Sequence, residues 1–253
     1  PAKLVTLQNG KTAWIVLRHK EVQEVLTSPK ISRDPSSDEF PQPRAGSTFK
    51  RNDVLLNHMD PPLHGRFRKM LAPWFTLKQV NALRDGMQQI VDDAIDRLLT
   101  LPQPVDFHRE FALVIPSSVI CQQLGIDYGY HEDFERLAAV ATSAGATQEE
   151  FGAATAELFA LVNTIIEEQI ANPQGGVLQM LTEAMQAGDI TREQCVANTY
   201  VLIVGGHETT AHSISLSMLQ LWRRPDIVER LREDPSLIPG MIDGFIRIQS
   251  VPD

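Results

Sequence analysis

The longest helical pattern of the chain is built around Val201-Leu202-Ile203-Val204-Gly205-Gly206-His207-Glu208-Thr209-Thr210-Ala211-His212. Two adjacent glycines inside a helix each cost about 1 kcal/mol relative to alanine. Their most direct use is to remove side chains where something flat or bulky approaches the backbone. An acid and a hydroxyl, Glu208 and Thr209, follow at once, and a threonine within a helix can bond back to the carbonyl one turn earlier and bend the helix. The stretch therefore predicts a long helix with a bend at its glycines.

Two interpretations of this bend stay open from the residues alone. If a ligand lies against the bend, Glu208 and Thr209 can relay protons to it; otherwise the glycines ease a crossing between helices, and Glu208 is a paired carboxylate. A zinc-protease helix is excluded because its histidines stand four residues apart, whereas His207 and His212 are five apart and face different ways. A phosphate loop is excluded because no Gly-Lys-Ser/Thr follows the glycines.

A second segment with chemical potential reads His58-Met59-Asp60-Pro61-Pro62-Leu63-His64-Gly65-Arg66-Phe67-Arg68. Its two prolines stop the preceding chain and set up the start of a helix. On that helix His64 and Arg68 are four residues apart and project from the same face. Together they make a clamp for a carboxylate or phosphate, because arginine offers a planar fork of donors. The alternative is a surface cap beside a solvated cation.

The N-terminal part predicts the only strands. Residues 4–8 and 12–17 are rich in β-branched and aromatic residues and flank Asn9-Gly10, which is typical of a hairpin. Residues His19 to Leu26 predict a short helix that ends at Ser28-Pro29, with one buried face formed by Val22, Val25 and Leu26.

The rest of the chain predicts a loop and then helices. Residues 33–53 are rich in Pro, Ser, Asp and Arg and predict a long surface loop, a kind of segment that is usually functional or mobile. In the helix around the two glycines, Thr191 and Gln194 have the spacing of a capping box. The fold class is therefore mostly α with a small β element. The predicted helices are 62–71, 77–100, 107–124, 130–143, 148–171, 176–186, 191–222, 225–233 and 236–247.

Composition narrows the class of protein. The chain has 253 residues, a net charge of −9 and a pI near 5.3, which argues against non-specific binding to nucleic acid or anionic membrane. No apolar run approaches the roughly 20 residues of a membrane-spanning helix, and the N-terminus shows no signal-peptide pattern. The two cysteines, Cys121 and Cys195, are expected to be buried thiols in a reducing compartment. We expect a cytoplasmic protein.

Four segments, in this order along the chain, resemble the cytochrome P450 family of the soluble bacterial type. The resemblance implies one P450-like domain over residues 1–253, with a β-rich start and B helix in 1–32 and a helical part in 58–253 that includes the C and I helices and runs through J and K. The segments are Gly10…Trp14-Ile15-Val16 with Val22…Leu26…Ser28-Pro29…Ser32, His58-Met59-Asp60-Pro61-Pro62…His64…Arg68…Phe75-Thr76, Val105-Asp106-Phe107…Phe111-Ala112…Ile115-Pro116…Val119-Ile120-Cys121…Leu124-Gly125, and Gly205-Gly206-His207-Glu208-Thr209-Thr210.

The resemblance also implies an activity and its cofactor. The family's members are haem-thiolate monooxygenases, which insert one oxygen atom of O2 into a substrate, here a small lipophilic compound or natural product. The cofactor would be heme b (iron protoporphyrin IX), and the electrons would come from a redox partner, a ferredoxin or a reductase. The loop near residues 33–53 would lie over the substrate entrance.

Roles for individual residues follow from the same resemblance. His64 and Arg68 would bind the haem propionates, and Gly205 and Gly206 would let the I helix kink over the distal face. Thr209 would hydrogen-bond the bound oxygen, and Glu208 would help bring protons to it. The substrate side of the pocket would be lined by Val201, Val204 and Gly205.

The sequence departs from the family pattern in two places. The chain ends before the loop whose cysteine ligates the iron, so this chain holds no metal ligand, is expected to be inactive alone, and leaves the edges of its N-terminal strands unpaired. In the K-helix position Arg247 is present, but Gly244 stands where the family has Glu, and Asp243 points about 100° away. One alternative is a haem-free P450-derived binding or recruitment module. Another is a nitric-oxide-reductase type, although the intact acid–alcohol pair favours the oxygenase.

Overall fold

The computed structural model describes residues 2–7, 10–37, 40, 53–143 and 145–249. The chain starts with an antiparallel hairpin of β1 (Ala2–Thr6) and β2 (Thr12–Val16), in which Leu4 lies opposite Trp14. Gly10 has a φ of +80°, the left-handed conformation that glycine adopts without a steric penalty. The predicted hairpin is confirmed, although its first strand begins two residues earlier than predicted. Within the described residues the sheet has these two strands only.

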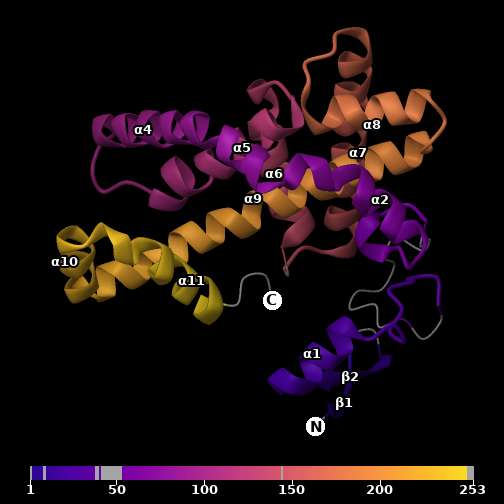
Figure 1. The fold of residues 1–253 in the computed structure, drawn as a ribbon, viewed down its shortest axis with the longest axis horizontal. Coiled ribbons are helices and arrows are strands. Elements are labelled where there is room, and N and C mark those ends of the chain that lie inside the picture. Colours follow the sequence, from indigo (N-terminus) through magenta and orange to yellow (C-terminus); the bar gives the residue numbers. More distant parts are fainter. Residues whose placement is uncertain (1, 8–9, 38–39, 41–52, 144, 250–253) are drawn as a thin grey trace.

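Helix α1 (His19–Thr27) has the predicted position, but its predicted buried face is wrong. None of its residues is buried, and the side chains of Val25 and Leu26 are 37% and 67% exposed. The physical reason is visible in the arrangement of the chain. The hairpin and α1 (indigo) lie at one edge of the molecule, outside the helical body that could cover this face (Figure 1).

The next helices lead into the body of the protein. They are η1 (Leu56–His58), α2 (Leu63–Leu71), η2 (Ala72–Phe75), α3 (Leu77–Ala82) and α4 (Arg84–Thr100). The single helix predicted over 77–100 is therefore two. Leu83, between them, has a ψ of −11°, which departs from the value near −42° of a regular α-helix.

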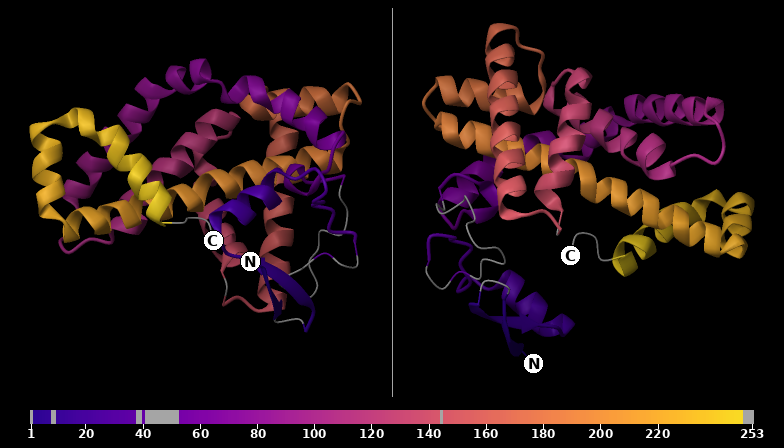
Figure 2. Two further views of the ribbon diagram at one scale, coloured as in Figure 1. Left: turned by 60° about the horizontal axis from the view of Figure 1, so that its bottom comes forward. Right: turned by 180° about the vertical axis from the view of Figure 1, so that it is seen from behind.

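The core lies where α9 meets four other helices, which makes five in all. These are α5 (Val114–Leu124), α6 (His131–Thr142), α7 (Gln148–Ala171), α8 (Gly176–Gln186) and α9 (Arg192–Arg223). Helix α9 passes through the middle of the helical body, and both α5 and α7 pack against it (Figure 2). The fully buried side chains of this core include Leu124, Leu158, Ile166, Leu178, Leu181 and Ile203.

Two capping boxes define where the longest helices begin. At α9, the Thr191 side chain accepts a hydrogen bond from the Gln194 N–H, and the Gln194 side chain accepts one from the Thr191 N–H, as predicted. Thr147 and Glu150 form the same arrangement at α7. Each box satisfies two backbone N–H groups that a helix start otherwise leaves without partners.

Helices α5 and α8 meet backbone to backbone at two glycines. Gly125 follows α5 with a φ of +75°, and Gly176 begins α8 with the same φ. A Cβ atom on Gly125 would lie 2.3 Å from the carbonyl oxygen of Gly175, and one on Gly176 would lie 2.4 Å from the backbone of Leu124. Only glycine fits at either position.

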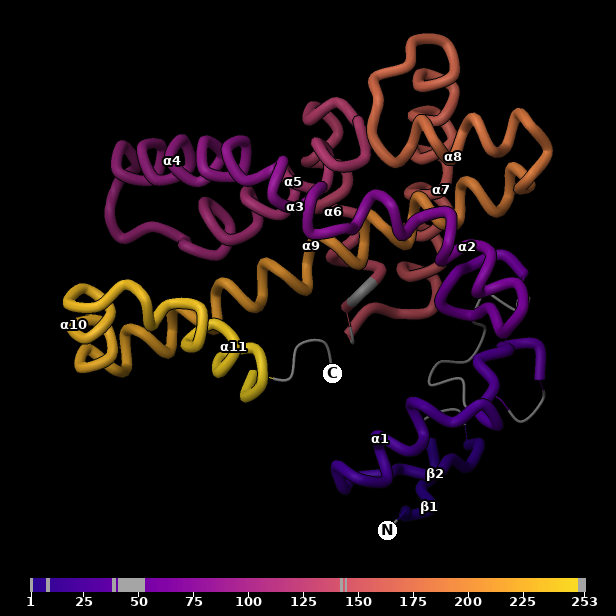
Figure 3. The backbone as a smooth tube through the Cα atoms, in the orientation of Figure 1, coloured from indigo at the N-terminus to yellow at the C-terminus, as the bar shows by residue number. Residues whose placement is uncertain are grey.

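The last helices fold back on the end of α9. Helix α10 (Pro225–Glu233), the turn η5 (Pro235–Leu237) and α11 (Ile238–Gln249) form a hairpin-like arrangement against it (Figure 3). Phe245 is buried there, whereas Ile246 and Ile248 are more than half exposed. None of the described helices is long and apolar enough to cross a membrane.

Between α4 and α5 the chain forms η3 (His108–Ala112), a π-helical turn, and the short η4 (Tyr128–Tyr130) precedes α6. The predicted helix 107–124 therefore contains one wider turn before it becomes regular.

Candidate functional site

The acid and hydroxyl predicted to carry chemistry lie half-buried in the middle of α9. The hydroxyl of Thr209 donates a hydrogen bond of 2.8 Å to the backbone carbonyl oxygen of Gly205, one turn earlier. This is the back-bond predicted from the sequence. Helix α9 continues through both glycines from Arg192 to Arg223. The hydroxyl and the Glu208 carboxyl are thus held on one continuous helix, and the bend at the glycines stays a prediction.

The two adjacent glycines have different surroundings. A Cβ atom on Gly206 would lie 2.9 Å from Cδ1 of Ile120 in α5, so this glycine permits the close crossing of α5 and α9. A Cβ atom on Gly205 would meet nothing within 4 Å, and Gly205 is exposed. The two interpretations left open by the sequence therefore divide between the residues. Gly206 serves helix packing, and Gly205 leaves open space beside the Thr209 hydroxyl.

The predicted substrate-side residues lie on the preceding turns of α9. Val204 is half-buried against the main core, and Val201 is half-buried against a small cluster formed by Val54, Leu55 and Ala197. The described part of the predicted 33–53 loop contains no helix or strand, and most of that loop lies outside the described residues.

Asn198, which sequence reasoning missed, fixes the segment that follows this loop. Its side-chain oxygen accepts from the Leu56 N–H at 2.9 Å, and its amide donates to the carbonyl oxygens of Val54 and Gln194 at 2.9 and 2.7 Å. Asn198 is only 1% exposed. A lone amide in an apolar helical stretch was the available signal, since buried polar groups need partners.

The predicted anion clamp lies on α2. His64 is half-buried, Arg68 is exposed, and the two residues are one turn apart. Among the residues that the structure describes, neither side chain takes part in a hydrogen bond or ion pair, so both are available to a ligand. Just before α2, Asp60 accepts hydrogen bonds from the Ser32 hydroxyl and the Arg33 N–H, and these bonds lower the pKa of its carboxyl.

A buried histidine stands next to the acid–alcohol pair. His207 is 1% exposed, and neither ring nitrogen has a hydrogen-bond partner within the described part of the chain. Burial lowers the pKa of its imidazole, and the nearby charges of His108 and His212 lower it further, against an opposing effect of Glu208. His212 is exposed, so the two histidines face different ways, as their five-residue spacing predicted.

The surroundings of His207 link α9 to two other helices. Its Nε2 lies 3.9 Å from Oε1 of Glu135 in α6, and that same oxygen lies 3.2 Å from the hydroxyl of Ser117 in α5. In the sequence this histidine appeared in the rejected zinc motif and in the segment that resembles the P450 family, but it was assigned no role of its own. Its position directly before the acid, inside an apolar helix, was the signal that it would be buried.

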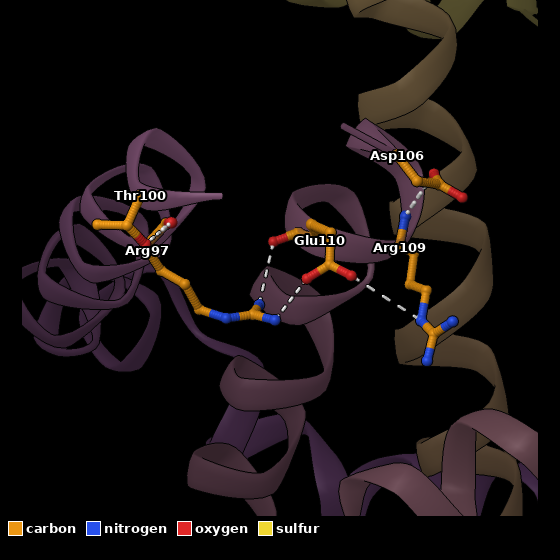
Figure 4. Close-up of polar contacts among 5 residues, drawn as sticks. All are labelled: Arg97, Thr100, Asp106, Arg109 and Glu110. Carbon is orange, nitrogen blue, oxygen red and sulfur yellow. Dashed lines mark hydrogen bonds and ion pairs between the residues drawn. The ribbon is translucent and has the colours of Figure 1, made fainter. Parts of the chain in front are cut away.

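Glu135 also lines the wall of a pocket of about 840 Å³ bounded by α4, η3, α5 and α6. One side of the pocket is fixed by a charge network (Figure 4), in which Glu110 accepts hydrogen bonds from Arg97 through both its carboxylate and its backbone carbonyl. Arg109 completes it, with Nε 4.0 Å from the Glu110 carboxylate. The network ties α4 to η3 and keeps the pocket wall in place.

The two cysteines are buried, as predicted. Cys121 is 2% exposed and Cys195 is fully buried. Burial raises the pKa of the Cys121 thiol to about 12 and that of the Cys195 thiol to about 11. Both thiols are therefore protonated at neutral pH and enclosed by the core, which suits a structural role.

The helix in the K-helix position is α11. A Cβ atom on Gly244 would meet nothing within 4 Å, and Arg247 is exposed. Of the described residues, none forms an ion pair with Arg247, and Asp243 does not replace the missing glutamate.

The residues present fit one side of a haem site. Arg68 and His64 offer unpaired donors for carboxylates, and Gly205 leaves space beside a hydroxyl on α9. The buried, protonated thiols do not fit the ligand position. These features match the propionate and distal parts of the site implied by the resemblance.

Comparisons with known proteins show which family the chain resembles. The family model described as Cytochrome P450 matches residues 140–240. The chain is 35% identical over 258 residues to cytochrome P450 105A3 of Streptomyces carbophilus, covering 98% of this chain and 61% of that protein. It is 33% identical over 256 residues to mycinamicin VIII C21 methyl hydroxylase of Micromonospora griseorubida, covering 100% of this chain and 64% of that protein.

Solved structures show the same likeness. The crystal structure of the mycinamicin hydroxylase bound to mycinamicin VIII has a TM-score of 0.90 and 32% identity, covering 100% of this chain and 64% of that chain. The tirandamycin C-bound P450 monooxygenase has a TM-score of 0.86 and 29% identity, covering 98% and 64%. The chain thus spans a little less than two thirds of the length of these relatives.

Proposed function

Because this chain belongs to the cytochrome P450 family, we propose that it forms the distal and propionate-binding part of a haem-thiolate monooxygenase. The reaction inserts one oxygen atom of O2 into a small lipophilic or natural-product substrate. One observation carries the proposal. The Thr209 hydroxyl lies next to Gly205, whose open side leaves room for a flat ligand against α9.

The α2 pair would hold the cofactor in register with α9. The propionates of haem are carboxylates, and the guanidinium of Arg68 can bind one of them through two parallel hydrogen bonds. His64, one turn earlier, would hold the other through its imidazole. When bound, the haem supplies the activation of O2, which a cysteine thiolate ligand promotes by pushing electron density toward the iron.

The chain's own contribution at the distal side is proton control. The Thr209 hydroxyl has one hydrogen, which it donates to the Gly205 carbonyl. A ligand on the open side of Gly205 would accept that hydrogen in exchange. The Glu208 carboxyl, next to Thr209 on the same turn, would replace the proton. The pair therefore holds one proton at Thr209 Oγ1 and a second on the adjacent acid.

The substrate would contact the apolar turns before this pair. Val201 and Val204 present aliphatic side chains, and apolar pockets bind ligands mainly by burying apolar surface. This suits a lipophilic compound, and the mycinamicin and tirandamycin complexes of the relatives contain natural products. The loop near 33–53 would cover the entrance, and a ferredoxin or reductase would supply the electrons.

The test is an absorption spectrum of the full-length gene product, reduced and exposed to carbon monoxide. We expect a thiolate-type Soret band, because the family's iron ligand is a cysteine. A pure full-length protein without haem would contradict the proposal and support the alternative, a haem-free binding or recruitment module. Product formation with added O2 and a ferredoxin system would then separate the oxygenase from a nitric-oxide-reductase type.

A further inference from the structure

The residue before the acid–alcohol pair, His207, is buried, and its Nε2 lies 3.9 Å from the carboxylate of Glu135 in the wall of the pocket between α4, η3, α5 and α6. We propose that Glu135 and His207 form a proton-supply route from that pocket to Glu208. The inference rests on the proposed function, since it supplies the acid that the monooxygenase reaction uses. Both residues would act through Glu208 and would touch neither the substrate nor the haem.

The entry to this route is the pocket between α4, η3, α5 and α6. Its volume of about 840 Å³ holds many water molecules, each of which occupies about 30 Å³ in the liquid. Glu135 lines it and has a side chain that is 24% exposed, so solvent reaches its carboxyl. The neighbouring Arg136 is already paired with Asp133 and Glu157. Among the described residues, the basic side chain within 4 Å of the Glu135 carboxylate is His207.

The middle of the route is the imidazole of His207. It lies behind the Glu135 carboxyl, 1% exposed, with 3.9 Å between Nε2 and Oε1. That separation exceeds a hydrogen bond by about 1 Å, which a rotation of the partly exposed Glu135 side chain closes. Both ring nitrogens are without hydrogen-bond partners in the described chain, so no bond fixes the ring in one tautomer. A structural histidine would have at least one such bond.

The exit is Glu208, the next residue of α9. Its carboxylate raises the pKa of the His207 imidazole, because an anion on the adjacent residue favours the charged ring. The other titratable groups near His207 are His108 on η3 and His212 on α9, and both disfavour a second positive charge there. Helix α5 contributes the Ser117 hydroxyl, which contacts Glu135. The ring therefore stays neutral at rest and can accept a proton.

The transfer balances as follows. The Glu135 carboxyl gives its proton to Nε2 of His207, the ring rotates about its side-chain bonds, and the imidazolium gives that same proton from Nε2 to the Glu208 carboxylate. Glu135 takes a new proton from water in the pocket. The ring is then neutral again with its hydrogen on Nδ1, and one proton has moved from the pocket to Glu208.

The test uses the full-length haem protein with Glu135→Gln, and with Glu132→Gln as the matched control. Both glutamates belong to α6 and line the same pocket, but only Glu135 contacts His207. Glutamine keeps the size of the side chain and its contact with Ser117 but carries no acidic proton. We expect kcat to fall about tenfold or more with KM unchanged in Glu135→Gln, and to change less than twofold in Glu132→Gln. The decline of kcat with rising pH should disappear in Glu135→Gln alone, and Glu135→Asp should retain most of the rate.

A second readout does not depend on turnover. The ring pKa of His207, followed by nitrogen NMR, should fall in Glu135→Gln, because removing an anion 3.9 Å from Nε2 disfavours the imidazolium. It should not change in Glu132→Gln. An unchanged ring pKa, or equal rates and pH profiles in the two variants, would overturn the relay. Absence of a thiolate-type spectrum would overturn the proposed function instead, and the ring titration would still decide whether Glu135 and His207 interact.

Discussion

The side-chain oxygen of Asn198 accepts a 2.9 Å hydrogen bond from the backbone N–H of Leu56, across 142 positions of sequence. The same amide donates to the Val54 carbonyl, so one buried residue of α9 fixes the segment that follows the predicted 33–53 loop. This arrangement places the end of that loop beside Val201.

We predict that Asn198→Leu lowers the free energy of unfolding by about 3 kcal/mol. Leucine has a similar volume but leaves the Leu56 N–H and the Val54 carbonyl without partners, and each lost bond costs about 1 kcal/mol or more. Urea denaturation measures the change. Asn163→Ala is the control, because its bonds to Arg192 are exposed. Equal losses in the two variants would contradict the anchoring role.

The two glycines of α9 should respond differently to alanine. Gly205→Ala should stabilise the helix by about 0.5–1 kcal/mol, because alanine favours helix and the added Cβ meets nothing. Gly206→Ala should give no such increase in stability, because the added Cβ would lie 2.9 Å from Cδ1 of Ile120. The double variant Gly206→Ala/Ile120→Val, which removes Cδ1, should recover it in thermal unfolding. No recovery would show that Ile120 does not limit this position.

Thr209→Ala should divert reducing equivalents to hydrogen peroxide in the full-length enzyme, because the hydroxyl that holds the proton is gone. Stability should change by less than about 0.5 kcal/mol, since the lost bond to Gly205 is offset by the higher helix propensity of alanine. Peroxide formed per reducing equivalent is the measurement. Thr210 is the next residue and is exposed, so in Thr210→Ala the consumption of reducing equivalents should remain coupled to product formation. Full coupling in Thr209→Ala would remove Thr209 from the proposed role.

Arg68→Ala should weaken retention of haem in the full-length protein by about tenfold or more. A charge-assisted pair with a carboxylate contributes about 1.5–3 kcal/mol, and Arg68 has no competing partner within the described residues. The rate of haem transfer to apomyoglobin measures retention. Lys69→Ala is the control, because Lys69 is exposed on the same helix. If the two variants lose haem at the same rate, Arg68 does not bind a propionate.

Burial of His207 predicts a specific dependence of stability on pH. Its folded pKa lies below the ordinary value of 6.5, so the unfolded chain binds more protons below pH 6.5. The free energy of unfolding should therefore fall as the pH drops from 7.5 to 5.5, by up to about 1.4 kcal/mol from this residue. His207→Phe should reduce that fall. An unchanged pH dependence in His207→Phe would show that the ring titrates alike in both states.

Local sequence signals were sufficient for most of the helical frame. The capping pair Thr191 and Gln194 placed the start of α9, and the glycine pair placed the acid–alcohol turn. These signals act within one turn of helix, so they can be recognised in the sequence without knowledge of the fold. The break at Leu83 was not, because it has no proline or glycine to mark it.

Features that depend on contacts between distant segments could not be predicted from the sequence. The apolar spacing of Val25 and Leu26 predicted a buried face, but no pattern within α1 tells whether another element covers it. The contacts of Asn198 with Leu56 and of His207 with Glu135 join residues far apart in the chain. Such contacts arise from the crossing of helices, which a single sequence does not reveal.

The backbone contact between Gly125 and Gly176 restricts which amino acids can replace either residue during evolution. At each position the backbone of the other segment occupies the space that a side chain would need. Neither glycine can therefore be substituted while the other segment keeps its position. In a saturation mutagenesis library selected for folded protein, we expect only glycine to survive at both positions, although neither residue takes part in chemistry. The two positions behave as one evolutionary unit, shared between the end of α5 and the start of α8.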